Sequence, residues 1–123
     1  MNKIETKNAP AAIGAYSQAI ITDNLIYTSG QIPLDPVTGI IVEGGITEQT
    51  ERAIMNIKAI LEGAGSGLDK VIKTTCFIAD INDFAAFNAK YAEFFTGCPA
   101  RSCVEVSALP KGALVEIEVI AER

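Results

Sequence analysis

The residue types that could do chemistry gather near the end of the chain, in two strand-like runs. PARSCVEV, residues 99–106, carries the cation Arg101 and the thiol Cys103, and KGALVEIEV, residues 111–119, carries the carboxylate Glu116. Residues two apart on a strand point the same way, so Arg101 and Cys103 are expected to share one face. A guanidinium binds a carboxylate well, and a nearby carboxyl can move a proton or hold water. The pattern therefore predicts a site for a small anionic substrate.

The two runs are expected to pair as a hairpin about Leu109 and Pro110. In that register Cys103 lies opposite Glu116, and Arg101 lies one pair further along the same face.

Each of these residues also has a structural explanation that the sequence leaves open. Arg101 could be a solvated or ion-paired surface arginine, and Glu116 an exposed strand carboxylate no different from Glu118. Cys103 could be a small buried residue, because nothing nearby in sequence would generate its thiolate.

Two further candidates lie in the first third of the chain. Ser29 and Gly30 end the strand-like run LIYTSGQI, residues 25–32, where a glycine lets a ligand approach the main chain; a bend before Pro33 explains them equally well. Tyr16, in the loop AAIGAYSQA, offers a phenol that could donate a hydrogen bond, and simple packing is the alternative.

Composition excludes several kinds of site. The 123 residues contain no histidine, which removes the commonest metal ligand and the usual imidazole base. Three cysteines without CxxC spacing indicate free thiols rather than a disulfide or zinc framework. A net charge of −5 disfavours a nucleic-acid partner, although a basic pocket around Arg101 remains compatible with it. The glycines of GAGSG follow a helix and precede a strand, the reverse of a phosphate-binding loop.

The periodicity predicts one α+β domain over residues 1–123. Helical spacing of apolar residues covers about residues 47–62, and VIKTTCFIA, residues 71–79, is a strong strand. Asn82 or Asp83 is expected to cap a second helix, whose stripe runs to Gly97 and includes Asn88, a polar residue expected to tie down neighbouring backbone. No apolar run reaches the roughly 20 residues that a membrane helix needs, so a cytoplasmic protein is the expectation.

Two helices can cover only one face of the sheet. The strand at 71–79 carries apolar residues on both faces, Val71, Thr75 and Phe77 against Ile72, Cys76 and Ile78. The second face then needs a cover that the chain does not supply, which predicts a homo-oligomer.

Four segments together resemble the YjgF/RidA family, and the similarity runs nearly end to end. They are IGAYSQAI, YTSGQIPLDPVTG, VIKTTCFIADINDFAAFNAKY and PARSCVEVSALPKGALVEIEVIA. The resemblance implies a chorismate-mutase-like fold, a mixed sheet with two helices on one face, assembled as a homotrimer with clefts between subunits. It also implies hydrolysis of reactive enamines and imines, such as 2-aminoacrylate, to 2-keto acids and ammonia without a cofactor or metal.

The same resemblance assigns roles to residues. Arg101 matches the carboxylate-binding arginine and Glu116 the glutamate that positions water, while Tyr16, Ser29, Gly30 and Cys103 match other positions of the cleft. Ala15 stands where many members have proline. The loop 96–98 is shorter than usual and places the Cys98 thiol near the cleft.

The sequence leaves two other functions open. One is a non-catalytic metabolite-binding regulator that uses the same Arg101 cleft. The other is a ribonuclease or translation inhibitor, which the acidic charge and the missing histidines disfavour.

Overall fold

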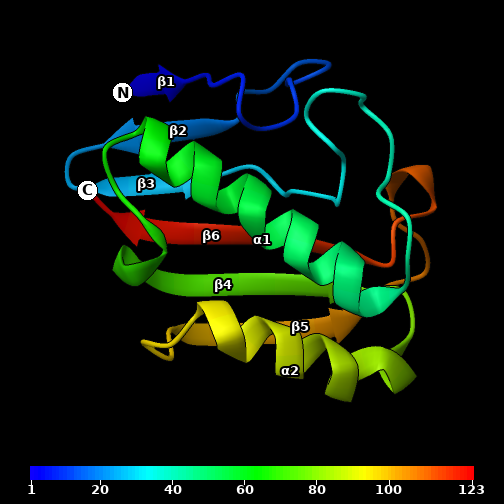
Figure 1. Ribbon diagram of the computed structural model, residues 1–123. Helices are drawn as coiled ribbons and strands as arrows, with labels where there is room; N and C mark the ends of the chain where they lie inside the picture. The colour runs from blue at the N-terminus through cyan, green and yellow to red at the C-terminus, as the bar shows by residue number, and fades with distance from the viewer.

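The computed structural model describes residues 1–123 and contains one six-stranded mixed sheet, with strands in the order β1-β2-β3-β6-β4-β5. The strands are β1 (Asn2–Ile4), β2 (Ala19–Thr22), β3 (Leu25–Thr28), β4 (Val71–Ile78), β5 (Ala100–Glu105) and β6 (Val115–Glu122). Only β4 and β5 pair in parallel, and every other neighbouring pair is antiparallel. Figure 1 shows how the last strand, β6, lies in the middle of the sheet between β3 and β4.

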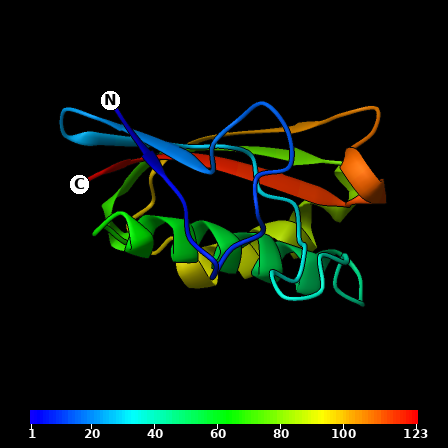
Figure 2. The same ribbon diagram turned by 90° about the horizontal axis from the view of Figure 1, so that it is seen from above.

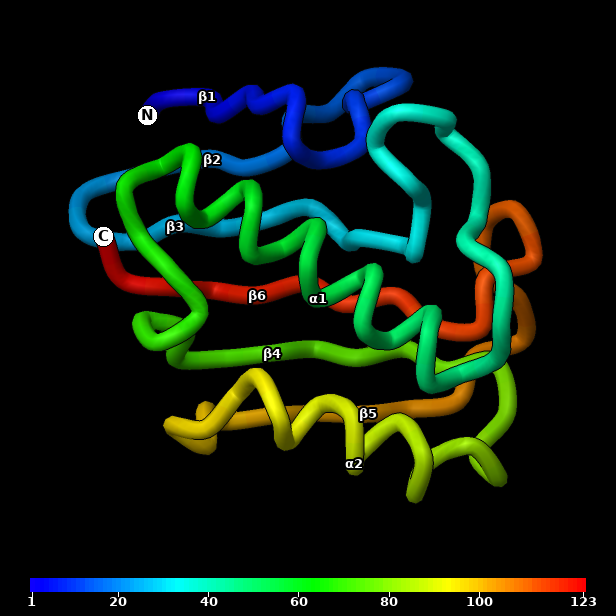
Figure 3. Tube along the Cα trace, in the orientation of Figure 1, coloured from blue at the N-terminus to red at the C-terminus, as the bar shows by residue number.

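Two helices, α1 (Ile46–Gly63) and α2 (Phe84–Phe94), pack on one face of the sheet. Figure 2 shows both helices on the same side, with no helix on the other, and Figure 3 follows the chain between them. Both predicted helices and the α+β class are confirmed. We call the two sides the helix face and the open face.

α1 forms because its apolar residues recur every three or four positions and meet the sheet as one stripe. Ala53, Ile54, Ile57, Ile60 and Leu61 are all fully buried. The helix ends where Gly65 takes a φ of +80°, a conformation that glycine adopts at little cost. Of the three glycines in GAGSG, Gly65 alone has a positive φ, since Gly63 is still helical and Gly67 is extended.

α2 presents an aromatic stripe to the sheet. Phe87 and Tyr91, one helical turn apart, are buried, and Phe95 follows one turn later. Asp83 takes the predicted N-cap position of α2, but its side chain makes no capping hydrogen bond. Asp80 instead caps the short 3₁₀ turn before α2, where it accepts from Asn82 N at 2.9 Å.

The open face combines apolar and charged residues. Tyr27 is 42% exposed and Val104 47% exposed there. A bulge between Val71 and Lys73 places Val71 on the buried helix face, so the strict alternation that grouped Val71 with Phe77 was wrong. Neither helix has the combination of length and apolar character required to cross a bilayer.

Candidate functional site

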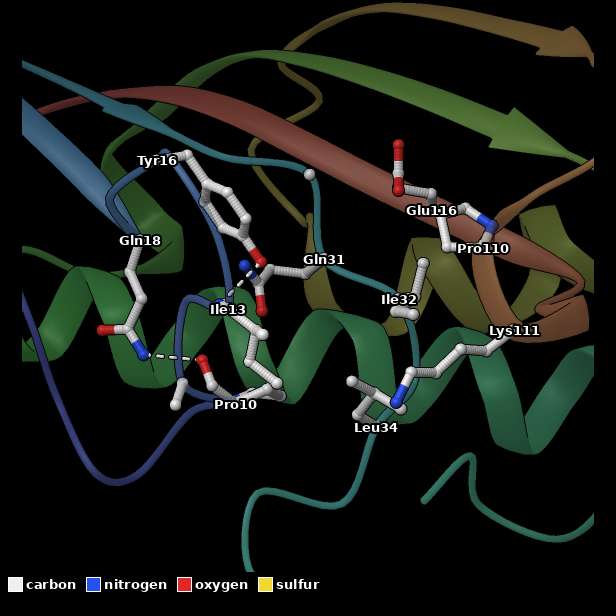
Figure 4. A pocket seen from close by; sticks show the side chains of 12 residues that line it. Pro10, Ile13, Tyr16, Gln18, Gln31, Ile32, Leu34, Pro110, Lys111 and Glu116 are labelled. Carbon is white, nitrogen blue, oxygen red and sulfur yellow. Dashed lines mark hydrogen bonds between the residues drawn. The ribbon is translucent and has the colours of Figure 1, made fainter. Parts of the chain in front are cut away.

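Four of the six predicted site residues line two separate pockets. The first, which we call the glutamate pocket, has a volume of 380 Å³ and includes Tyr16, Gly30, Lys111 and Glu116 in its wall (Figure 4). The second, the arginine pocket, has a volume of 630 Å³ and includes Arg101. Ser29 and Cys103 line neither.

Glu116 and Arg101 lie on opposite faces of the sheet. β4 separates β5 from β6, so the predicted hairpin between residues 99–106 and 111–119 is wrong. Arg101 pairs with Thr74 on the helix face, whereas Glu116 pairs with Phe77 on the open face. Three residues of rise and two strand spacings put their Cα atoms about 14 Å apart. Arg101 shares a face with Cys103, as predicted, and Glu116 shares a face with Glu118.

The physical reason for the difference is the crossover. α2 connects β4 to β5 in parallel, as a strand-helix-strand unit does, and β6 then returns antiparallel on the other side of β4. Strands that are consecutive in sequence usually pair with each other, but β5 and β6 do not. β5 pairs with one edge of β4, and β6 pairs with the other edge, between β4 and β3.

Glu116 packs against Gly30. A Cβ atom added to Gly30 would lie 2.8 Å from both Cδ and Oε2 of Glu116, so any other residue there would displace the carboxyl group. Main-chain bonds between Gln31 and Ile117, at 2.8 and 3.1 Å, hold the two segments together. Gly30 was expected to let a ligand approach the main chain. In this structure the space beside Gly30 is filled by the side chain of Glu116.

The environment of Glu116 favours its protonated form. Partial burial raises the pKa of this carboxyl above its usual value, and the negative charge of Glu118, two residues along the same face, raises it further. No lysine or arginine lies within ion-pair distance of it. A carboxyl group with a raised pKa exchanges protons nearer to neutral pH.

The loop that carries Tyr16 rises beyond the open face (Figure 2). Tyr16 is 53% exposed, and its phenol oxygen accepts a long hydrogen bond from Ile13 N at 3.4 Å. Ser29 anchors this loop, because its hydroxyl donates to Ser17 O at 2.6 Å. The Ser29 side chain is therefore committed to the protein, while the Tyr16 phenol can still donate to a ligand.

Arg101 is held between aromatic rings and an amide. Its Nη1 donates to Asn88 Oδ1 at 2.6 Å, and its guanidinium carbon lies 4.7 Å from the centre of the Tyr91 ring. Asn88 was expected to bind backbone, and it binds this guanidinium instead. No carboxylate lies within ion-pair distance, so most of the guanidinium donors have no partner in the chain.

The cysteines differ in exposure. Cys76 is fully buried, and burial raises the pKa of its thiol to about 12. Burial also raises the pKa of Cys103, which packs against the core on the helix face. The raised pKa of Cys103 and its packing against the core both favour the structural explanation for this residue. Cys98 is exposed and lines the arginine pocket.

Three buried amides that the sequence reasoning missed position the glutamate pocket. Gln18 accepts from Thr6 N at 2.7 Å and donates to Pro10 O at 2.7 Å (Figure 4). Asn56 donates to Ile32 O at 3.2 Å and Leu34 O at 2.9 Å, and Gln49 accepts from Leu114 N at 2.8 Å. Asn56 interrupts the apolar stripe of α1, which is the signal that could have identified it.

These two pockets together contain a free guanidinium, a carboxyl of raised pKa and an accessible phenol. The guanidinium can bind a carboxylate, and the carboxyl group can hold water or transfer a proton. No three His, Cys, Asp or Glu side chains gather in a way that could hold a metal ion.

Known proteins are similar to this chain over its whole length. The family model described as Endoribonuclease L-PSP matches residues 6–123. A Lactococcus lactis protein named as a regulator, AldR, is 56% identical over 123 residues, covering 99% of this chain and 98% of that protein. The 2-iminobutanoate/2-iminopropanoate deaminase of Salmonella typhimurium is 50% identical over 124 residues, covering 98% of this chain and 96% of that protein.

A solved structure agrees with the fold. The crystal structure of E. coli TdcF with bound serine is 44% identical, covers 100% of this chain and 99% of that chain, and superposes with a TM-score of 0.95. Sequence and fold therefore agree that the chain belongs to the endoribonuclease L-PSP family, which is the YjgF/RidA family.

Proposed function

We propose that the protein is a 2-iminobutanoate/2-iminopropanoate deaminase, which hydrolyses enamine and imine intermediates such as 2-aminoacrylate to 2-keto acids and ammonia. The observation that carries the proposal is the state of Arg101. Its guanidinium is half-buried, has no acidic partner and donates one side-chain hydrogen bond, to Asn88. A planar donor with free N–H groups in a partly apolar pocket suits a substrate carboxylate.

A site that uses both Arg101 and Glu116 requires two copies of the chain, because the two side chains lie on opposite faces of one sheet. A second copy whose edge strand, β5, meets the open face of the first would bring its own Arg101 toward the glutamate pocket. It would also bury Tyr27 and Val104, which supports the homo-oligomer expected from the uncovered face and is compatible with the homotrimer that the family resemblance implies. The serine bound to TdcF is a small carboxylate ligand in a protein of the same fold.

The reaction then needs few groups. Arg101 binds the substrate carboxylate, and a proton added to the β-carbon of the enamine gives the imine. Water held by Glu116 adds its oxygen to the α-carbon as the electron pair of the C=N bond moves to nitrogen. The nitrogen takes up a proton and leaves as ammonia while the carbonyl of the keto acid forms. In this proposal the exposed phenol of Tyr16 donates a hydrogen bond to the substrate.

Orientation and electrostatics are sufficient for such a step. Imines hydrolyse in water unaided, so the barrier to be lowered is modest. Glu116 can carry a proton in one step and release it in another, because its pKa is raised toward neutral pH.

A coupled assay tests the proposal. A pyridoxal-phosphate-dependent dehydratase generates the enamine, and ammonia release is timed with and without this protein. We expect the wild-type protein to accelerate release and Arg101→Ala to reduce kcat/KM by about 100-fold or more, from the loss of a charge-assisted carboxylate contact. Arg123→Ala is the matched control, since Arg123 is exposed at the chain end. Equal rates with wild type, Arg101→Ala and no protein would exclude the deaminase.

A non-catalytic metabolite-binding regulator is the second candidate, favoured by the 56% identity to AldR. It would bind a 2-keto acid through Arg101 without turnover, and Glu116→Ala would leave the affinity unchanged. A deaminase would instead lose turnover in that variant.

A ribonuclease or translation inhibitor is the third candidate, because the family description includes the word endoribonuclease. The net charge of −5 and the absence of histidine argue against it. Cleavage of purified RNA by the wild-type protein, lost in Arg101→Ala, would favour it.

A further inference from the structure

The guanidinium of Arg101 is fixed by three residues on one face of α2. Its central carbon lies 5.5 Å from the centre of the Phe84 ring and 4.7 Å from that of Tyr91, and Asn88 Oδ1 lies 2.6 Å from Nη1. Positions 84, 88 and 91 are one helical turn apart in succession, so they present a continuous surface to the strand. Both ring distances are within the range of cation–π attraction.

The Tyr91 ring is itself buried and closely packed. It is 5% exposed, and its centre lies 4.5 Å from that of Phe95 and 5.6 Å from that of Phe87. Its phenol oxygen forms a hydrogen bond of 2.8 Å with the Thr74 hydroxyl, and Thr74 is fully buried. Thr74 is also the residue paired with Arg101 across the β4–β5 register. Arg101, Thr74 and Tyr91 therefore form a closed ring of contacts.

Packing alone does not require this arrangement. A Phe and Val pair would fill nearly the same space without burying two hydroxyl groups, each of which needs a partner. The hydroxyl pair does one thing that an apolar pair would not, since it ties the Tyr91 ring to Thr74 on β4, the residue that pairs with Arg101 on β5.

We infer that Tyr91, held by Thr74, is a positioning residue that fixes the plane of the Arg101 guanidinium, so that its free edge meets the planar carboxylate of a 2-imino or 2-oxo acid. This inference rests on the proposed function for its substrate class. Tyr91 lies against the guanidinium and Asn88 occupies Nη1, which leaves the other donors for the ligand. Tyr91 is not placed against the reacting atoms.

A positioning role predicts an effect on binding more than on chemistry. Without the ring, the guanidinium samples more orientations and binds the carboxylate less well, whereas Glu116, which another copy contributes to the site, keeps its position against Gly30. Substitutions that remove the Tyr91 ring should therefore raise the substrate KM and the Kd of a keto acid while changing kcat little.

The experiment measures the Kd of 2-oxobutanoate by calorimetry, together with KM and kcat in the coupled deaminase assay. We expect Tyr91→Leu to weaken both binding constants by about 5- to 30-fold, and Tyr91→Phe to restore most of the loss because it keeps the ring. Thr74→Val should weaken binding by about two- to fivefold. Phe94→Leu is the matched control, since it removes an aromatic ring from the same helix that has no contact with Arg101.

The outcomes separate the two proposals. If Tyr91→Leu binds 2-oxobutanoate as wild type does, or if Phe94→Leu loses as much affinity at equal Tm, the positioning role is refuted. If the wild-type protein binds 2-oxobutanoate without hydrolysing imines, the deaminase is refuted, and the Kd series alone decides on Tyr91. If the wild-type protein neither binds nor hydrolyses, both proposals fail.

Discussion

The carboxyl group of Glu116 lies in the space that a side chain at position 30 would fill, so the place of the proposed water-holding group depends on Gly30. A Cβ atom at position 30 would fall 2.8 Å from Glu116 Cδ. We expect Gly30→Ala to push the carboxyl group aside and lower kcat about 10- to 100-fold, because a displacement of about 1 Å is costly at a reacting centre. Steady-state kinetics with the coupled dehydratase measures this.

Stability should change much less than activity in that variant. The clash is with the end of a flexible side chain, and Gly30 does not have a positive φ. Gly97→Ala is a suitable control, since an added Cβ there meets no atom within 4 Å. If Gly30→Ala keeps full kcat, the position of Glu116 is irrelevant to the reaction.

The pH dependence of the reaction should follow Glu116. Its pKa lies above 4.5, first because of burial and then because of the Glu118 charge. Activity that needs the ionised carboxylate falls as the pH drops through this raised pKa. Glu118→Gln removes one cause, so we expect the acid limb of the kcat/KM profile to move to lower pH. An unchanged limb would show that Glu116 does not control it.

The same pKa has a consequence for stability with a definite sign. The folded protein binds the Glu116 proton more tightly than the unfolded chain does, so the free energy of unfolding falls as pH rises from 4.5 through the raised pKa. Denaturant titrations at several pH values in this range measure the free energy of unfolding. This free energy should fall less with rising pH in Glu116→Gln than in wild type.

Asn88→Asp should impair substrate binding although it preserves shape. A carboxylate 2.6 Å from Arg101 Nη1 would form an ion pair with the guanidinium and compete with the substrate. We expect KM to rise about tenfold or more with a smaller change in kcat. High salt should not rescue a pair that is half-buried. A KM equal to that of wild type would mean that the substrate carboxylate does not bind Arg101.

Gln18→Leu should loosen the loop that carries Tyr16. Gln18 is 2% exposed, and its amide bonds to both Thr6 and Pro10, so the substitution leaves partly buried backbone groups without partners. We expect a loss of about 2–4 kcal/mol in the free energy of unfolding and faster amide exchange in residues 5–17. Normal exchange in this loop would show that other contacts hold it.

The sequence predicted the local features of the fold well and one long-range feature badly. The helix stripes of α1 and α2 follow from apolar spacing, and the face alternation of Arg101 with Cys103 follows from the two-residue period of a strand. Neither depends on which strands become neighbours. The pairing of β5 with β4 rather than β6 depends on the crossover through α2, which no periodicity encodes, so the expected meeting of Arg101 and Glu116 within one chain was wrong.

Candidate residues could be named from chemistry, but their supporting contacts could not. Arg101 and Glu116 stand out by charge in apolar strands. The partners of buried amides such as Gln18 and Asn56 are backbone groups far along the chain, and their identity depends on loop positions that only the fold determines.

The central claim is that Arg101 of one copy and Glu116 of another form a single site, and complementation between inactive variants tests it most directly. Arg101→Ala and Glu116→Gln are each purified, then unfolded and refolded together in equal amounts. Each alone should be nearly inactive, and the mixture should regain about a quarter of wild-type activity, because one in four random pairs of neighbouring copies contributes both intact residues. A mixture no more active than its components would contradict the account.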